Sequence, residues 1–248
     1  MRIETYFASA ALVTQLERAG AVAHVHHDGG DIIHLELRSR EHILLHLIES
    51  SIPLPEIIAT LEANSARRHY TLFLFWVDRL LPPDGQTHQV DAWMRPLLAL
   101  YEDRLYGYEV HGRHIFVFPV FFEGSGEVRR IRYGPHIDVS RIACRALPLR
   151  RDGLDGLYYA ADFGERATVH PRPAIHPLAA EYARLGLEAE ADVRAVKHAY
   201  RRLARHFHPD VNTDPAATQH MQQINEAYRR ILRALHSEAQ RRARHSQT

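Results

Sequence analysis

The pattern of the sequence changes once along the chain, at a proline-rich stretch. Residues 164–177 read GERATVHPRPAIHP and contain three prolines. Proline lacks a backbone donor and holds the residue before it extended, so this stretch is typical of a semi-stiff linker. Strand-like and helix-like patterns alternate before it, whereas only helical patterns follow it. We therefore predict an α+β chain in which a mixed α/β domain at 1–163, a linker at 164–177 and an all-helical unit at 178–248 follow one another.

Within the first domain, hydrophobic periodicity and turn residues set the expected elements. The segment Tyr70 to Val77 is apolar on both faces, which predicts a buried central strand. Asp28-Gly29-Gly30 predicts a tight hairpin turn. The domain should end in antiparallel strands. We expect strands at 3–7, 22–26, 32–37, 70–77, 105–110, 114–122, 128–133, 137–146 and 157–161, and helices at 9–18, 40–50, 55–64 and 90–101.

Composition limits the classes of function. Cys144 is the only cysteine, which excludes an internal disulfide and an all-cysteine zinc site. We find neither a membrane-spanning apolar run nor a leader sequence, so we expect a cytoplasmic protein with no membrane partner. Lys197 is the only lysine, and this arginine bias suggests a bacterial source. From residue 179 onward, 12 basic residues face 8 acidic ones, which gives a net charge of +4 and leaves −3 for the rest.

The last 70 residues predict three helices. The first covers 178–185 and ends at Gly186, and Asp192 can cap the second. The apolar residues of the second helix recur every three or four positions and form one core-facing stripe: Val196, Ala199, Leu203 and Phe207. A third helix should start at Asp214-Pro215. Its expected inner face consists of Met221, Ile224, Ala227, Tyr228, Ile231 and Leu235.

The opposite side of the second helix is basic. Arg194, Lys197, Arg201 and Arg205 recur at the same spacing and form a cationic stripe. His208-Pro209 should end this helix, because a residue before proline is pushed out of helical geometry.

Four segments of this unit resemble the J domain of the DnaJ family. Tyr182-Ala-Arg-Leu-Gly-Leu187 is similar to the opening of that domain, and Val196-Lys-His-Ala-Tyr-Arg-Arg-Leu-Ala204 to its second helix. His208-Pro209-Asp210 matches the signature loop, and Ile224-Asn-Glu-Ala-Tyr-Arg-Arg-Ile231 the third helix. The resemblance covers roughly 178–235. Glu181 and Ala183 depart from it, because the family often has paired aromatics there. The short fourth helix of the family is not evident after Leu235.

The resemblance implies a co-chaperone that docks on a DnaK-type chaperone and stimulates its ATP hydrolysis, so the chain itself would not be an enzyme. The glycine/phenylalanine linker and the zinc module of the family are missing, so residues 1–163 would recruit an unknown client. A basic helix can also bind nucleic acid, but its net charge is modest and the J-domain interpretation is preferred. The expected partner-binding residues are Lys197, Tyr200, Arg201, Arg202, Arg205, His208, Pro209 and Asp210.

The histidines leave an alternative open. The chain has 19 of them, and His42 and His46 would share one face of the expected helix at 40–50. The rival hypothesis is therefore an enzyme in the first domain, with or without a metal ion, that the J domain regulates or assembles. A cluster of Glu36, Asp78, Asp84 and Asp91 could serve such an enzyme. Without an HExxH motif or nearby cysteines, we prefer surface and hairpin histidines, and we expect no metal and no cofactor.

Overall fold

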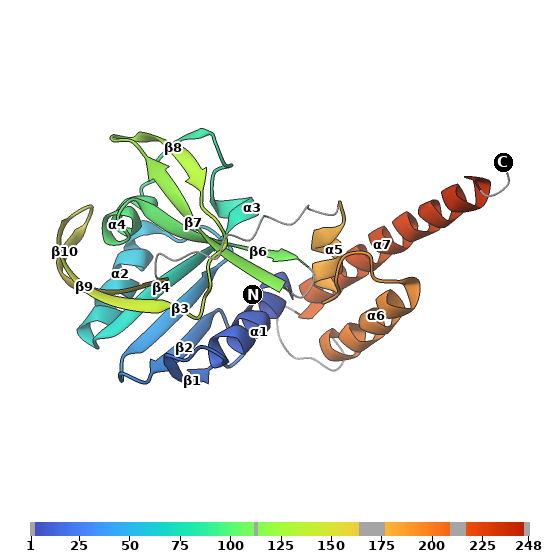
Figure 1. Cartoon of the computed structure of the whole chain (residues 1–248), viewed down its shortest axis with the longest axis horizontal. Helices are drawn as coiled ribbons and strands as arrows, with labels where there is room; N and C mark the ends of the chain where they lie inside the picture. The colour runs from blue at the N-terminus through green and yellow to red at the C-terminus, as the bar shows by residue number, and fades with distance from the viewer. Residues whose placement is uncertain (1–2, 112–113, 164–176, 209–216, 246–248) are drawn as a thin grey trace. The chain divides into compact units, whose positions relative to one another are not determined.

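The computed structural model describes residues 3–111, 114–163, 177–208 and 217–245. For residues 3–8, 78, 111, 114 and 238–245 it describes only the backbone. The predicted α+β class is confirmed, because a strand-rich part is followed by a helical part (Figure 1). The chain divides into two compact units, one built around a sheet and one around the last three helices.

The strand-rich part of the chain contains a sheet of ten described strands and four helices. Their bounds are α1 (Ile3–Glu17), β1 (Val22–His26), β2 (Ile32–Leu37), β3 (His42–Ile48), α2 (Leu54–Ala66), β4 (His69–Trp76), α3 (Val77–Leu80), β5 (Thr87–Gln89), α4 (Met94–Leu100), β6 (Arg104–His111), β7 (His114–Glu123), β8 (Val128–Tyr133), β9 (Ile142–Arg151) and β10 (Leu154–Phe163).

The strands follow the order β1-β2-β3-β4-β6-β7-β8-β5. The first three form an antiparallel meander, whereas β4 runs parallel to both β3 and β6. The expected antiparallel tail is present as the pair β9 and β10, and β10 also pairs with β4. β4 therefore lies at the centre of the domain, and all its residues from Thr71 to Trp76 are buried. This confirms the prediction of a buried central strand.

Strands β2 and β3 have one buried and one half-open face. In β2, Ile33, Leu35 and Leu37 are buried, while His34 and Glu36 between them are half-buried. β3 alternates in the same way from His42 onward. Because side chains on a strand alternate between faces, the polar residues of both strands share the half-open face.

Two sequence predictions in this domain are wrong. Residues 3–7 were expected as a strand but form the first part of helix α1. Residues 40–50 were expected as a helix, but 42–48 form β3, because this segment pairs with β2 on one side and β4 on the other. His42 and His46 therefore share a strand face and not a helix face. The expected helix at 90–101 and strand at 137–146 exist with shifted bounds, as α4 and β9.

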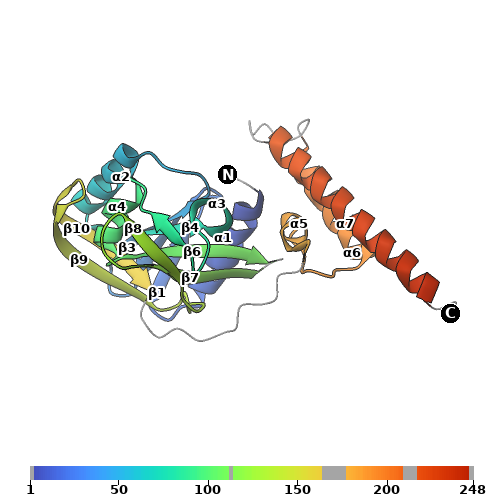
Figure 2. The ribbon, with the colours of Figure 1, turned by 90° about the horizontal axis from the view of Figure 1, so that it is seen from above.

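The helical part of the chain consists of α5 (Ala179–Arg184), α6 (Val193–Phe207) and α7 (Ala217–His245). Figure 2 shows α6 running beside the longer α7, and the two helices pack directly on one another. No fourth helix follows within the described residues, because α7 continues to His245. Among the described helices, none combines the length and apolar character needed to cross a membrane.

Candidate functional site

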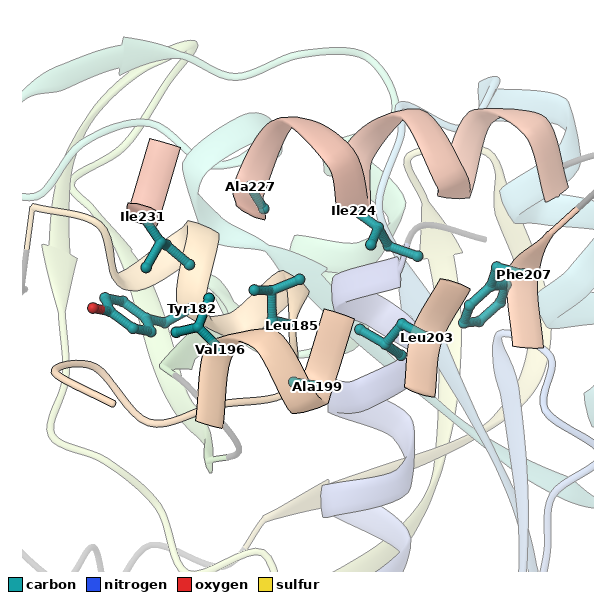
Figure 3. Close-up of a cluster of buried hydrophobic side chains, with 9 residues drawn as sticks. All are labelled: Tyr182, Leu185, Val196, Ala199, Leu203, Phe207, Ile224, Ala227 and Ile231. Atoms are coloured by element: carbon teal, nitrogen blue, oxygen red, sulfur yellow. The ribbon is translucent and has the colours of Figure 1, made fainter. Parts of the chain in front are cut away.

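The core of the C-terminal unit is formed by the predicted stripe of α6. Figure 3 shows the side chains of this stripe pointing toward those of α7, with two residues from α5 and its end closing the cluster. The residues are Val196, Ala199, Leu203 and Phe207 from α6, Ile224, Ala227 and Ile231 from α7, and Tyr182 and Leu185. All nine are buried, so the orientation of α6 is fixed by its apolar side.

The predicted capping residues set the C-terminal end of α5 and the N-terminal start of α6. Gly186 adopts a φ of 65°, a conformation that glycine allows at low cost, and directs the chain out of α5. The amides of Gly186 and Leu187 donate to the carbonyls of Ala183 and Tyr182 and close a Schellman motif. The carboxylate of Asp192 accepts a 2.7 Å hydrogen bond from the amide of Ala195 and caps α6. Both predicted caps are confirmed.

A buried acid ties α5 to α7. Glu181 is only 5% exposed, and its carboxylate accepts a hydrogen bond from the guanidinium of Arg230. A buried carboxylate is tolerated when it is paired in this way. The sequence showed Glu181 only as a departure from the family pattern. Its partner could not be identified, because the two residues are far apart in the chain and no periodicity links them.

The cationic stripe of α6 faces solvent, as predicted. Arg194, Lys197, Arg201 and Arg205 are all exposed, and Arg202 beside them is exposed too. Within the described residues, no acidic side chain forms an ion pair with any of these five cations. The exposed side of α6 therefore presents a row of positive charges along its length.

Tyr200 lies away from this stripe. It is half-buried between α6 and α7, and its hydroxyl donates a 2.9 Å hydrogen bond to Oδ1 of Asn225. Its ring stacks on that of Tyr228, with centroids 4.2 Å apart. The structure thus brings the four predicted cations of α6 together but places Tyr200 in the packing between the helices. Its role in partner binding stays a prediction.

The signature loop begins where the sequence predicted. Helix α6 ends at Phe207, and His208 follows as its exposed C-terminal cap with an extended backbone (φ −65°, ψ 130°). This conformation is the one that a following proline requires. Pro209, Asp210 and the expected cap Asp214 lie outside the described residues.

Among the described side chains, the acidic residues suggested as a carboxylate cluster in the first domain each lie beside a different residue. Asp84 accepts a hydrogen bond from the amide of Tyr133, and Asp91 lies 3.7 Å from the ring of His88. Glu36 lies on β2 opposite His42. For Asp78 only the backbone is described, so the suggested carboxylate cluster gains no support from the described side chains.

Comparison with known proteins agrees with this geometry. The family model of the DnaJ domain matches residues 180–243. The chaperone protein DnaJ of Trichormus variabilis is 45% identical over 64 residues, which are 26% of this chain and 16% of that protein. DnaJ of Methanothermobacter thermautotrophicus gives the same identity and coverage. DnaJ 1 of Synechocystis is 51% identical over 47 residues, which are 19% of this chain and 12% of that protein. No solved structure is a significant match.

The family match lies in the C-terminal part of the chain, and the chain spans less than a fifth of the length of these relatives. Within that part, the matched residues contain the two-helix core, the capped start of α6 and the beginning of the signature loop. The C-terminal part of the chain is therefore a J domain of the DnaJ family.

Proposed function

We propose that this J domain docks onto a DnaK-type chaperone and stimulates its ATP hydrolysis. The observation that carries the proposal is the family match over 180–243, on a helix α6 whose core side is packed and whose cationic side is exposed. The J-domain family consists of co-chaperones and not of enzymes, so the rival enzyme hypothesis is not favoured. Hydrolysis would take place in the site of the partner.

The stripe on α6 would guide the first encounter with an acidic surface of the chaperone. Exposed charges of this kind mainly accelerate association, and salt screens them over about 8 Å at physiological ionic strength. His208 stands at the end of the helix, next to the loop residues Pro209 and Asp210. Asp210 can offer a charge-assisted hydrogen bond to an arginine of the partner, which gives the docked complex a directed contact.

The strand-rich domain would bring a client protein to the chaperone. Tethering a client-binding domain to a J domain raises the effective concentration of client near the chaperone without any new contact. A pull-down from the source cell that compares the whole chain with residues 1–163 tests this part. Clients should be retained by both, whereas the chaperone should be retained by the whole chain alone. A cytoplasmic location remains an expectation that rests on the sequence.

The substitution Asp210→Asn tests the docking proposal most directly. It keeps the size of the side chain but removes its charge, and loss of one partner of a desolvated pair costs roughly 2 to 5 kcal/mol. Single-turnover ATP hydrolysis by the cognate DnaK-type chaperone should therefore be accelerated by the wild-type protein and not by the variant. The stability of the domain should barely change, because loop charges contribute little to folding.

Glu190→Gln is the matched control, because Glu190 is an exposed acid in the connection between α5 and α6 of the same domain. This variant should stimulate hydrolysis as the wild type does. Equal helicity by circular dichroism would show that all three proteins are folded. Full stimulation by Asp210→Asn would refute the proposed docking role of the loop.

A further inference from the structure

Histidines of four neighbouring strands gather on the half-open face of the sheet. Strand pairing places them in two adjacent rows that cross β1, β2, β3 and β4. Residues directly opposite one another on paired strands have Cβ atoms about 4.5 to 5.5 Å apart. One row consists of His24, Glu36, His42 and His69, and the next row begins with His26 and His34. We call these six residues the imidazole face.

Three of these rings touch one another. The ring centroids of His34 and His42 are 5.3 Å apart, those of His42 and His69 5.4 Å, and those of His34 and His69 5.9 Å. Nε2 of His34 lies 3.3 Å from Nδ1 of His42. Nδ1 of His69 is buried and has no hydrogen-bond partner among the described residues. A buried polar atom without a hydrogen-bond partner is energetically unfavourable, so this nitrogen is a candidate to bind a ligand.

The surroundings of His34 and His69 favour the neutral forms of their imidazoles. Burial lowers the pKa of His34, and the neighbouring rings of His42, His69 and His26 lower it further, while Glu36 opposes the shift. Burial also lowers the pKa of His69, together with His42 and Arg67. A neutral imidazole has a free nitrogen lone pair, which is the form that binds metal ions.

We propose that His34, His42 and His69 bind one divalent transition-metal ion, best matched by Zn²⁺. Imidazole nitrogen is a preferred ligand of zinc, nickel and copper, and three histidines with an open fourth position form a known type of zinc coordination. Two nitrogens bound to a tetrahedral zinc ion at about 2.0 to 2.1 Å lie about 3.4 Å apart. The nitrogens of His34 and His42 already have nearly this separation.

The third ligand would have to move. Within the described part of the chain, no three such side chains are already arranged to hold an ion. His69 is half-buried at the start of β4, so its ring would have to turn toward His34 and His42 when the ion binds. The ion would then link β2, β3 and β4. This site is independent of the J domain and implies binding only, without catalysis.

Calorimetric titration of the full chain with zinc sulfate at pH 7.5 tests the site. We expect one zinc ion per chain, and the double variant His34→Gln, His42→Gln should bind it at least about tenfold more weakly. The control is His236→Gln, because His236 is an exposed histidine of the J domain, far from these strands in the sequence. It should leave zinc binding unchanged. A wild-type chain that takes up no zinc, or a double variant that binds it equally well, would overturn the proposal.

X-ray absorption at the zinc edge of the loaded wild-type protein avoids reliance on variants that could fold poorly. The spectrum should show nitrogen and oxygen ligands near 2.0 Å and the multiple scattering typical of about three imidazoles. A spectrum with two or fewer imidazole ligands would contradict the assignment.

Discussion

At the scale of single residues, His46 links the stability of the strand-rich domain to pH. It lies on β3, where its Nε2 is 3.4 Å from the side-chain amide of Asn64 and its ring centroid is 5.0 Å from that of Phe73. Burial lowers the pKa of His46 to about 4, and the carboxylate of Asp31 only partly opposes this shift. The amide of Asn64 can donate to Nε2 only while that nitrogen is unprotonated. The folded protein therefore holds this imidazole neutral.

We predict that this domain loses stability as the pH falls from about 6.5 toward 4. The unfolded chain has a histidine pKa of about 6.5, so below that value it binds a proton that folded His46 does not yet accept. The loss due to His46 should reach about 2 to 3 kcal/mol near pH 4. Urea unfolding followed by tryptophan fluorescence measures it, because both tryptophans, Trp76 and Trp93, lie in this domain.

The variant His46→Leu removes the titrating group and should unfold with a shallower dependence on pH in this window. The control is His24→Leu, which removes an exposed histidine of the same sheet and should behave as the wild type does. If His46→Leu and the wild type lose stability in parallel, the free energy must come from other groups.

At the scale of elements, short apolar segments were the least predictable part of the fold. Residues 42–48 carry histidines four positions apart, which a helix and a strand both place on one face. This segment forms a strand because it pairs with β2 and β4. Such long-range partners cannot be predicted from local periodicity. β4 was predictable because a short continuous apolar run bounded by polar residues is typical of a strand that is buried on both faces.

The J domain was far more predictable, because its signals are local. The glycine after α5, the cap at Asp192 and the two faces of α6 each follow from residues close together in the sequence. The direction of Tyr200 was harder to predict, because it depends on contacts with Asn225 and Tyr228 on the next helix. A side chain at the border between the apolar and polar faces of a helix can pack against the neighbouring helix or point into solvent. Which of the two occurs depends on the residues of that neighbouring helix.

The stripe on α6 leads to a prediction about association. The double variant Arg201→Glu, Arg205→Glu should slow binding to the DnaK-type chaperone, because it reverses two exposed charges on the proposed docking side. Dissociation should change less, and the difference from the wild type should shrink in high salt. Stopped-flow or surface-based kinetics at several salt concentrations measures both rates.

Helix α7 offers a closely matched control for this experiment. Arg229 and Arg233 are also exposed, also four residues apart, and linked by the same contact from guanidinium to backbone carbonyl as Arg201 and Arg205. The variant Arg229→Glu, Arg233→Glu therefore makes the same change in net charge on another helix. If both variants slow association equally, total charge and not the stripe on α6 controls docking.

At the scale of the whole molecule, two parts with different composition are joined by a proline-rich segment. The part before residue 179 has a net charge of −3 and the part after it +4. One part has a sheet with its own buried strands, and the other has a separate cluster of buried side chains. Separate cores are what allow two domains to fold independently and to bind different partners. The boundaries 1–163 and 178–248 remain a prediction from the sequence.

We predict that limited proteolysis with a protease of broad specificity cuts between Val169 and Ala174 and leaves two resistant fragments. The three prolines of 164–177 disfavour regular secondary structure, and exposed connections between domains are preferred sites of cleavage. Mass spectrometry should identify the cut, and only the larger fragment should show tryptophan fluorescence, because both tryptophans precede the linker. Residues 178–248 produced alone should retain helical circular dichroism and unfold cooperatively, since the cluster around Leu203 and Ile224 lies entirely within them. First cuts within the strands, or a separate C-terminal fragment without helical signal, would show that the two parts depend on each other to fold.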